Sequence, residues 1–226
     1  MVNTCTVTAE GDLKSRKLIR QLARQNPGAR ILVMGCYATR APETVAALPG
    51  VSEVVTEKRD LPALLERLGL AHAPSGISGF GRRHRAYVKV QDGCRMPCSY
   101  CIIPYARGPI RSRNKKEVIE EITRLVNHGY QEVVLTGIHL ASYGKDMKKP
   151  DELIKLLESI DKIKGLKRMR LGSLEPTLMN QPFVARLMKL KTLCQHFHLS
   201  LQSGCDKTLK AMNRKYSTEA YALSLI

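Results

Sequence analysis

Short apolar segments alternate with longer amphipathic ones along most of the chain, and this alternation restricts the possible folds more than any other feature of its 226 residues. The short segments are typical of buried strands, and the longer ones have the spacing of helices with one apolar face. Strands that alternate with helices pair in parallel, because each helix carries the chain back across the sheet. In the first 70 residues, strands are predicted over 2–7, 29–34 and 52–56, a loop over 8–11, and helices over 13–25, 42–48 and 61–68.

The alternation starts again after residues 71–84, which are rich in Gly, Pro, Ser and basic side chains and are expected to link two domains. Beyond this linker, strands are predicted over 86–90, 132–136, 168–171 and 196–202, with helices over 116–128, 151–163, 182–190 and 206–213 and another opening at Ser217. We therefore expect an α/β protein. Residues 1–70 are expected to form a parallel-sheet domain of the flavodoxin-like or Rossmann-like kind that lacks its start. Residues 85–226 are expected to form a partial (β/α) barrel that lacks its end, with its chemistry at the carboxyl ends of the strands.

The chain is strongly basic, with 37 Lys and Arg against 20 Asp and Glu and a net charge of +17. Residues 71–115 hold nine basic side chains and one acidic one, so nearly half of the excess lies in this segment. Such an excess predicts a polyanionic partner, nucleic acid before an anionic membrane, although a solubilising surface is the common alternative. Arg107, Arg111 and Arg113 are candidates for contacts with a nucleic-acid backbone or a charged cofactor. The longest apolar runs are too short to span a bilayer, so no membrane partner is expected.

Seven cysteines form the other unusual feature, and three of them, Cys94, Cys98 and Cys101, lie within eight positions. An odd count without a signal peptide argues against a secreted disulfide framework and predicts a reducing compartment, the cytoplasm. Thiolates on one loop at spacings of four and three can converge on one iron–sulfur cluster and leave one iron open for a ligand. A zinc site completed by His84 or His128, or simply buried thiols, are the alternatives.

The residues around these cysteines resemble a known family. Cys-x-x-x-Cys-x-x-Cys after a strand is the signature of radical S-adenosylmethionine (radical SAM) enzymes, and the wider context is similar to their methylthiotransferase branch. The resemblance rests on segments 90–108, 111–113, 135–144, 171–176 and 198–204, and on 2–5 and 34–37 for the amino-terminal domain. Gly-Ile-His-Leu-Ala-Ser-Tyr-Gly over 137–144 is similar to enzymes that act on N6-threonylcarbamoyladenosine in tRNA. Enzymes that act on isopentenyladenosine in tRNA, or on an aspartate of a ribosomal protein, are the alternatives.

The resemblance implies that Cys94, Cys98 and Cys101 hold a [4Fe-4S] cluster whose open iron binds S-adenosylmethionine. It implies methylthiolation of carbon 2 of N6-threonylcarbamoyladenosine at tRNA position 37, in the anticodon region, with an electron donor such as a flavodoxin or ferredoxin. Cys5 and Cys36 match two of the three ligands of a second [4Fe-4S] cluster in this family, and the third would lie upstream. The carboxyl-terminal RNA-binding β-domain that is usual in the family is expected to be absent. A fragment of this kind is of doubtful activity alone.

Further residues are expected near the cofactor because they lie beside the last cluster thiol or at the carboxyl ends of predicted strands. They are Tyr100, Gly137, Ser173, Glu175, Gln202 and Ser203. Ordinary loop packing or an end-of-strand hydrogen bond is the alternative for each. His196 and His198 alternate on a predicted strand and are expected in the core, and Cys194 and Cys205 are expected to be ordinary thiols. A zinc-stabilised RNA-binding module without catalysis, or an inactive fragment, is the rival interpretation of the whole chain.

Overall fold

The structure is a computed structural model, and it describes residues 1–70, 76–77, 79, 84–149 and 151–225. Contacts divide the chain into two units, Met1–Ala73 with Cys101–Gly108 and Pro74–Tyr100 with Pro109–Ile226. Most of the linker expected over 71–84 lies outside the described residues. The described helices include none with the length and apolar character that crossing a membrane requires.

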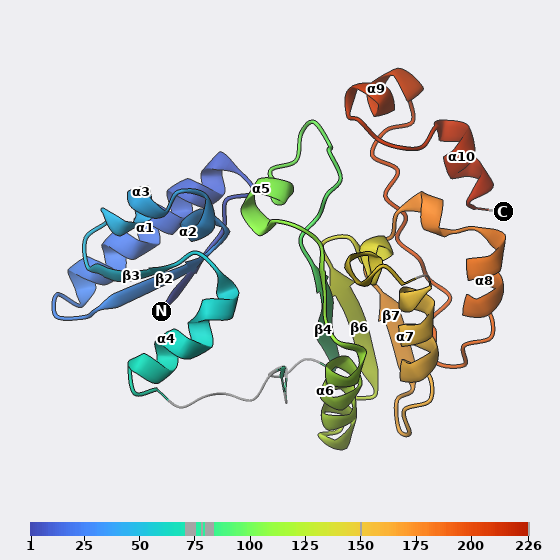
Figure 1. The fold of residues 1–226 in the computed structure, drawn as a ribbon, viewed down its shortest axis with the longest axis horizontal. Helices are drawn as coiled ribbons and strands as arrows, with labels where there is room; N and C mark the ends of the chain where they lie inside the picture. The colour runs from blue at the N-terminus through green and yellow to red at the C-terminus, as the bar shows by residue number, and fades with distance from the viewer. Residues whose placement is uncertain (71–75, 78, 80–83, 150, 226) are drawn as a thin grey trace. The chain divides into compact units, whose positions relative to one another are not determined.

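The first unit contains a three-stranded parallel sheet in the order β1-β2-β3 (Figure 1). The strands are β1 (Val2–Thr4), β2 (Ile31–Gly35) and β3 (Val51–Val55). The helices that follow them are α1 (Ala9–Gln25), α2 (Cys36–Arg40), α3 (Pro42–Ala46) and α4 (Leu61–Arg67), with a short 3-10 turn over Lys58–Asp60.

Helices cover both faces of this sheet, which is why every residue of its central strand β2 is buried. Ile31 and Val33 belong to the core formed with α1, α2 and α3, whereas Leu32 and Met34 pack in a separate core with Leu64 of α4. Successive side chains of a strand point to opposite faces, so an uninterrupted apolar strand is what a two-sided sheet requires. The expected parallel-sheet architecture is confirmed.

Helix α1 begins earlier than expected, and the loop predicted over 8–11 is wrong. Thr8 takes the extended N-cap conformation, and its Oγ1 accepts a hydrogen bond from the backbone N–H of Gly11 at 3.1 Å. Glu10 and Asp12 lie in the first turn, where acidic side chains interact favourably with the helix dipole. These local interactions outweigh the helix-weakening effect of Gly11.

The second unit contains a four-stranded sheet in the order β5-β4-β6-β7. The strands β4 (Arg85–Asp92), β6 (Glu132–Gly137) and β7 (Arg168–Leu171) run parallel, and β5 (Arg111–Ser112) pairs antiparallel with β4. The helices of this unit are α6 (Lys115–Asn127), α7 (Glu152–Ile160), α8 (Gln181–Leu187), α9 (Asp206–Ala211) and α10 (Thr218–Leu223). Three 3-10 turns cover Leu140–Ser142, Lys145–Met147 and Pro176–Leu178.

One face of this sheet is packed and the other is polar, as in part of a barrel wall. Ala86, Val88 and Val90 of β4 are fully buried in the core that the sheet shares with α6, α7 and α8 (Figure 1). The intervening Tyr87 and Lys89 are exposed on the opposite face. The expected partial (β/α) barrel is therefore confirmed, and the carboxyl ends of β4, β6 and β7 form one edge of it.

The strand expected over 196–202 is absent, and the segment meets its neighbours only through isolated parallel bridges, Met169 with Leu193 and Leu174 with Leu199. His196 and His198 are both exposed, so their expected place in the core is wrong. The alternation of apolar and polar residues was misleading here because two single bridges do not enclose one face of the segment. Helices α2 and α5 (Ile103–Arg107) and strand β5 were not anticipated, since elements of two to five residues have almost no periodicity.

Candidate active site

The cysteine loop leaves the carboxyl end of β4 through a turn that the fully buried Gln91 fixes. Its amide Nε2 donates to the carbonyl oxygens of Asp92 at 2.8 Å and Gly93 at 2.7 Å. Gly93 has φ 71°, which glycine adopts without strain, and its N–H donates to Asp92 Oδ1 at 2.9 Å. Cys94 follows directly, and its Sγ accepts a hydrogen bond from the backbone N–H of Met96 at 3.3 Å. The turn therefore presents the first thiol at the strand end.

The donor chemistry of the three clustered cysteines fits an iron–sulfur cluster. All three are partly buried, and none of the seven cysteines, each of which lies in the described part of the chain, forms a disulfide. Cys94 and Cys98 belong to the second unit, whereas Cys101 is grouped with the first unit together with α5. Among the described residues, no three His, Cys, Asp or Glu side chains are already gathered in metal-binding geometry. Three thiols within eight positions are nevertheless the donor set that such clusters use.

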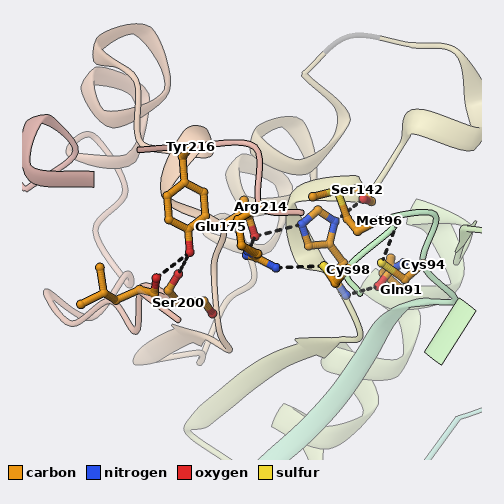
Figure 2. A network of polar contacts seen from close by, with 11 residues as sticks. Gln91, Cys94, Met96, Cys98, Ser142, Glu175, Ser200, Arg214 and Tyr216 are labelled. Carbon is orange, nitrogen blue, oxygen red and sulfur yellow. Dashed lines mark hydrogen bonds and ion pairs between the residues drawn. The ribbon is translucent and has the colours of Figure 1, made fainter. Parts of the chain in front are cut away.

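Beside Cys98, a buried ion pair connects the cysteine loop to the segment that follows β7 (Figure 2). Arg214 Nη1 donates to Cys98 Sγ at 3.3 Å, and its Nη2 donates to Glu175 Oε2 at 2.6 Å. Both charged side chains are 6% exposed. Their pairing agrees with the rule that buried charges are kept only where they are paired and hydrogen-bonded.

His139 joins the same network from the loop after β6. Its Nε2 lies 3.5 Å from Glu175 Oε2, its Nδ1 contacts Ser142 Oγ, and its backbone N–H donates to Gln91 Oε1 at 2.8 Å. Gln91 therefore connects the turn before Cys94 to the loop after β6, while His139 extends the connection to Glu175. Carboxyl ends of three parallel strands contribute to one polar network.

Burial alone would raise the pKa of Glu175, but His139 and the charge of Arg214 outweigh it, so the pKa of this carboxyl is lowered. Burial lowers the pKa of Arg214, whereas its hydrogen bond to Cys98 and the charge of Glu175 raise it, with a net rise. Both groups are therefore charged at neutral pH. Glu175 Oε1 and Arg214 Nε are buried and have no hydrogen-bond partner among the described residues, whereas the buried His139 Nε2 lies against Glu175 Oε2 at 3.5 Å. A polar ligand with donors and acceptors fits such atoms, because buried polar groups are normally satisfied.

The structure brings only some of the expected cofactor residues to this network. Glu175 lies in its centre, and Gly137 packs on Gln91 so closely that a Cβ there would lie 2.9 Å from Gln91 Oε1. Tyr100, Ser173 and Gln202 are exposed, and Ser203 Oγ accepts a hydrogen bond from the backbone N–H of Cys205 at 3.2 Å. Their roles toward a cofactor stay predictions.

The three candidate arginines are in different surroundings. Arg113 Nη1 donates to the carbonyl of Lys89 at 3.0 Å and pairs at 2.6 Å with Glu121, a carboxylate that is only 4% exposed. Arg113 therefore supports the contact between β4 and α6. Arg111 is exposed on β5, and Arg107 is partly buried at the end of α5 in the first unit.

Sequence reasoning missed Gln91, His139 and Arg214 as members of the site. His139 lies inside the 137–144 motif and Gln91 inside the segment that leads to Cys94, so position within these motifs was an available indication. No sequence indication was available for Arg214, because nothing in the pattern distinguishes it from the other basic side chains. Its place becomes evident only when the segment after α9 reaches the cysteine loop.

The first unit places Cys5 and Cys36 at the same edge of its sheet. Thr4 of β1 pairs with Gly35 of β2, and each of the two cysteines directly follows one of these paired residues. Cys36 is buried at the start of α2, while Cys5 is exposed and its N–H donates to Ser15 Oγ of α1 at 3.4 Å. Gly35 has φ 105°, and a Cβ there would collide with the backbone of Thr4, so the close approach of the two strand ends requires glycine.

A parallel α/β sheet, a partial (β/α) barrel and three clustered thiols after the first barrel strand define a class of cluster-binding barrel proteins. Residues 88–224 match the family model described as the Radical SAM superfamily, and this range is more than half of the chain. The chain therefore belongs to the radical SAM superfamily. Residues 1–56 match the model described as Uncharacterized protein family UPF0004.

Within that superfamily, the chain is similar to curated tRNA-modifying enzymes. It is 40% identical to the threonylcarbamoyladenosine tRNA methylthiotransferase MtaB of Bacillus subtilis, over 98% of this chain and 53% of the relative. The corresponding enzyme of Aquifex aeolicus is 37% identical over 98% of this chain and 58% of its own. The tRNA-2-methylthio-N(6)-dimethylallyladenosine synthase of Carboxydothermus hydrogenoformans is 34% identical over 98% and 55%. The chain spans about half the length of the curated relatives it matches.

Two solved structures share the fold at low sequence identity. The radical S-adenosylmethionine methyltransferase TsrM from Kitasatospora setae superposes with a TM-score of 0.69 at 14% identity, covering 100% of this chain and 53% of that one. The cobalamin-dependent radical enzyme OxsB gives a TM-score of 0.64 at 13% identity, over 99% of this chain and 38% of that one. These likenesses support the fold alone.

Proposed function

We propose that this chain forms the catalytic part of a methylthiotransferase that modifies carbon 2 of N6-threonylcarbamoyladenosine at position 37 of tRNA. One observation carries the proposal: the polar network around Cys98 and Glu175 lies at the carboxyl ends of the barrel strands, in a chain 40% identical to an enzyme of that name. The 137–144 segment, which supplies His139 to the network, is also the segment whose sequence favours this substrate over isopentenyladenosine or a ribosomal aspartate.

Cys94, Cys98 and Cys101 are the proposed ligands of a [4Fe-4S] cluster. Together with S-adenosylmethionine, the bound cluster supplies the one-electron chemistry that begins hydrogen abstraction. The chain's own residues orient and enclose these groups. Gln91 holds the turn before Cys94, and the atoms proposed to accept from and donate to the polar groups of S-adenosylmethionine are Glu175 Oε1 and Arg214 Nε, which have no hydrogen-bond partner among the described residues.

Cys5 and Cys36 are the proposed ligands of a second [4Fe-4S] cluster in the first unit. Their support is the pairing of Thr4 with Gly35, which sets both cysteines at one sheet edge. Helix α5, which follows Cys101, packs against α2, which begins with Cys36, so the first unit also holds the segment after the third clustered cysteine.

The proposed partners are the anticodon region of tRNA and an electron donor such as a flavodoxin or ferredoxin. The basic excess over residues 71–115 supports the first, because phosphate contacts from Lys and Arg provide most of the affinity for nucleic acid. Among the candidate arginines, Arg111 is the one that is exposed, and it is therefore the one proposed for such contacts.

Mass spectrometry of tRNA nucleosides from a strain that lacks the gene tests the function. We expect the 2-methylthio derivative of N6-threonylcarbamoyladenosine to disappear and its precursor to accumulate. The full-length gene should restore the product, Cys98→Ala should not, and Cys205→Ala should restore it as a matched cysteine control, because Cys205 lies outside the motif. Persistence of the product in the deletion strain would refute the proposal. Loss of the isopentenyladenosine derivative, or of a methylthiolated ribosomal aspartate, would move the assignment to that alternative.

A further inference from the structure

The end of α9 and the segment that follows it are attached to the cysteine loop by three hydrogen bonds besides that of Arg214. Ser99 N–H donates to the carbonyl of Met212 at 3.3 Å, and Ser99 Oγ donates to that of Ala211 at 2.9 Å. Asn213 Nδ2 donates to the carbonyl of Pro97 at 2.8 Å. Asn213 has φ 56°, a left-handed conformation that Asn adopts more readily than most residues, and it directs the chain from α9 onto the loop. Residues more than 110 positions apart are therefore held together on both sides of Cys98.

The guanidinium of Arg214 is itself fixed from several directions. Its carbon lies 5.2 Å from the centre of the Tyr216 ring, and the Tyr216 hydroxyl donates to the carbonyls of Ser200 at 2.6 Å and Leu201 at 2.8 Å (Figure 2). Glu175 accepts from one terminal nitrogen while Cys98 accepts from the other. A planar, permanently charged fork can serve two acceptors in this way, whereas a lysine ammonium is a single point of charge. Arginine at this position is thus preorganised toward the sulfur.

A cation that donates a hydrogen bond to a cluster sulfur favours the reduced cluster, because reduction adds one negative charge. Hydrogen bonds to the sulfurs and nearby net charge are among the factors that set the potentials of such clusters. Residues that contact a metal ligand without touching the metal commonly tune the site and orient the ligand. Glu175 partly offsets the charge of Arg214, so the two side chains act on Cys98 in opposite directions.

We propose that Arg214 is a positioning residue that holds Cys98 and raises the reduction potential of the cluster that Cys98 ligates. The negative charge of Glu175 partly opposes this rise. This inference rests on the proposed function, because it requires Cys98 to be a cluster ligand. It adds a role for a residue far along the chain from the cysteine motif. It also explains why the ion pair is buried beside a thiol and not at the surface.

The test is a potentiometric titration of the full chain, reconstituted anaerobically with iron and sulfide, reduced with dithionite and followed by electron paramagnetic resonance. Cys5→Ala and Cys36→Ala in every sample leave one cluster to observe. We expect Arg214→Met to make reduction at least tenfold less favourable, a shift of about 59 mV to more negative potential for a one-electron couple. Arg214→Lys should recover at least half of this shift, and Glu175→Gln should move the potential to more positive values.

Arg186→Met is the matched control, because Arg186 is also an ion-paired arginine of the second unit, bound to Glu158 at 2.8 Å, and should leave the potential unchanged. A wild-type potential in Arg214→Met, or an Arg214→Lys variant that behaves like Arg214→Met, would overturn the inference. If Arg214→Met fails to fold or to bind iron, Arg214→Lys and Glu175→Gln decide, and unchanged potentials in both overturn it. Absence of any cluster in the parent chain would instead refute the proposed function.

Discussion

Glu132 is a buried carboxylate at the start of β6, surrounded by three arginines. Its oxygens lie 2.7 Å from Arg168 Nε, 2.8 Å from Arg170 Nε and 3.6 Å from Arg85 Nε, and its side chain is 10% exposed. The hydrogen bond from Arg168 lowers the pKa of Glu132 more than burial raises it, and Arg170 lowers it further. One carboxylate thus joins β4, β6 and β7 on the polar face of the sheet, at the end opposite the cysteine loop.

Replacing this carboxylate should have a pH-dependent cost. We expect Glu132→Gln to lower the free energy of unfolding at pH 7 by about 1–3 kcal/mol, because hydrogen bonds to a charged group are lost and the arginines are left in excess. Since folding lowers the pKa of Glu132, the contribution of its charge to the free energy of unfolding is complete above the unfolded pKa of about 4.3. This contribution disappears as pH falls through the folded pKa. Urea unfolding at pH 7 and at about pH 3 measures the difference.

The matched control is Glu120→Gln on α6, since the Glu120 side chain is 59% exposed and lies 3.9 Å from Lys116. Its stability should match that of the wild type at both pH values. A loss in Glu132→Gln that is equally large at low pH would show that shape, and not charge, is what the position requires.

The role of an individual residue was predictable where the residue belongs to a sequence motif. It was not predictable where the role depends on tertiary contacts. Cys94, Cys98 and Cys101 stand out by spacing alone, and Glu175 by its place after a predicted strand. Arg214 could not be predicted, because its role depends on Asn213 directing the chain back to Pro97. Arg113 shows the opposite error, since a basic segment does not reveal that one of its arginines is bound to the buried Glu121.

At the scale of elements, the start of α1 depends on one side chain. Thr8→Ala removes the acceptor for Gly11 N–H and should lower the free energy of unfolding by about 1 kcal/mol. Thr8→Ser retains a hydroxyl acceptor and should therefore keep most of the stability that the cap contributes. Urea denaturation of the three chains, followed by circular dichroism, is the measurement. Equal stability of Thr8→Ala and the wild type would mean that the helix start is held by tertiary contacts and not by the cap.

Element types were predictable where the pattern was long and repeated. The helices α1 and α6 and the strands β2, β4, β6 and β7 all lie where the apolar periodicity indicates. The segment over 196–202 has the same alternation but is not a strand, because pairing at only two bridges leaves His196 and His198 in solvent. Alternation shows what a segment is compatible with, and hydrogen-bonding neighbours decide whether it pairs.

At the scale of the molecule, the repeated βα pattern was sufficient to indicate two α/β units, whereas the charge pattern favours a nucleic-acid partner that stays a proposal. Neither reveals that Cys101–Gly108 groups with the first unit while Cys94 and Cys98 group with the second. That division depends on contacts of α5 with α2, which no local pattern encodes.

The central claim is that Cys94, Cys98 and Cys101 ligate an iron–sulfur cluster, and the iron and sulfide content of the anaerobically reconstituted chain tests it most directly. Replacing all three cysteines with alanine should remove about four iron atoms per chain, the content of one [4Fe-4S] cluster, and the matching visible absorption. A Cys194→Ala, Cys205→Ala variant should keep both. Equal iron content in the wild type and the triple variant, or a colourless wild-type protein that binds zinc instead, would contradict the account.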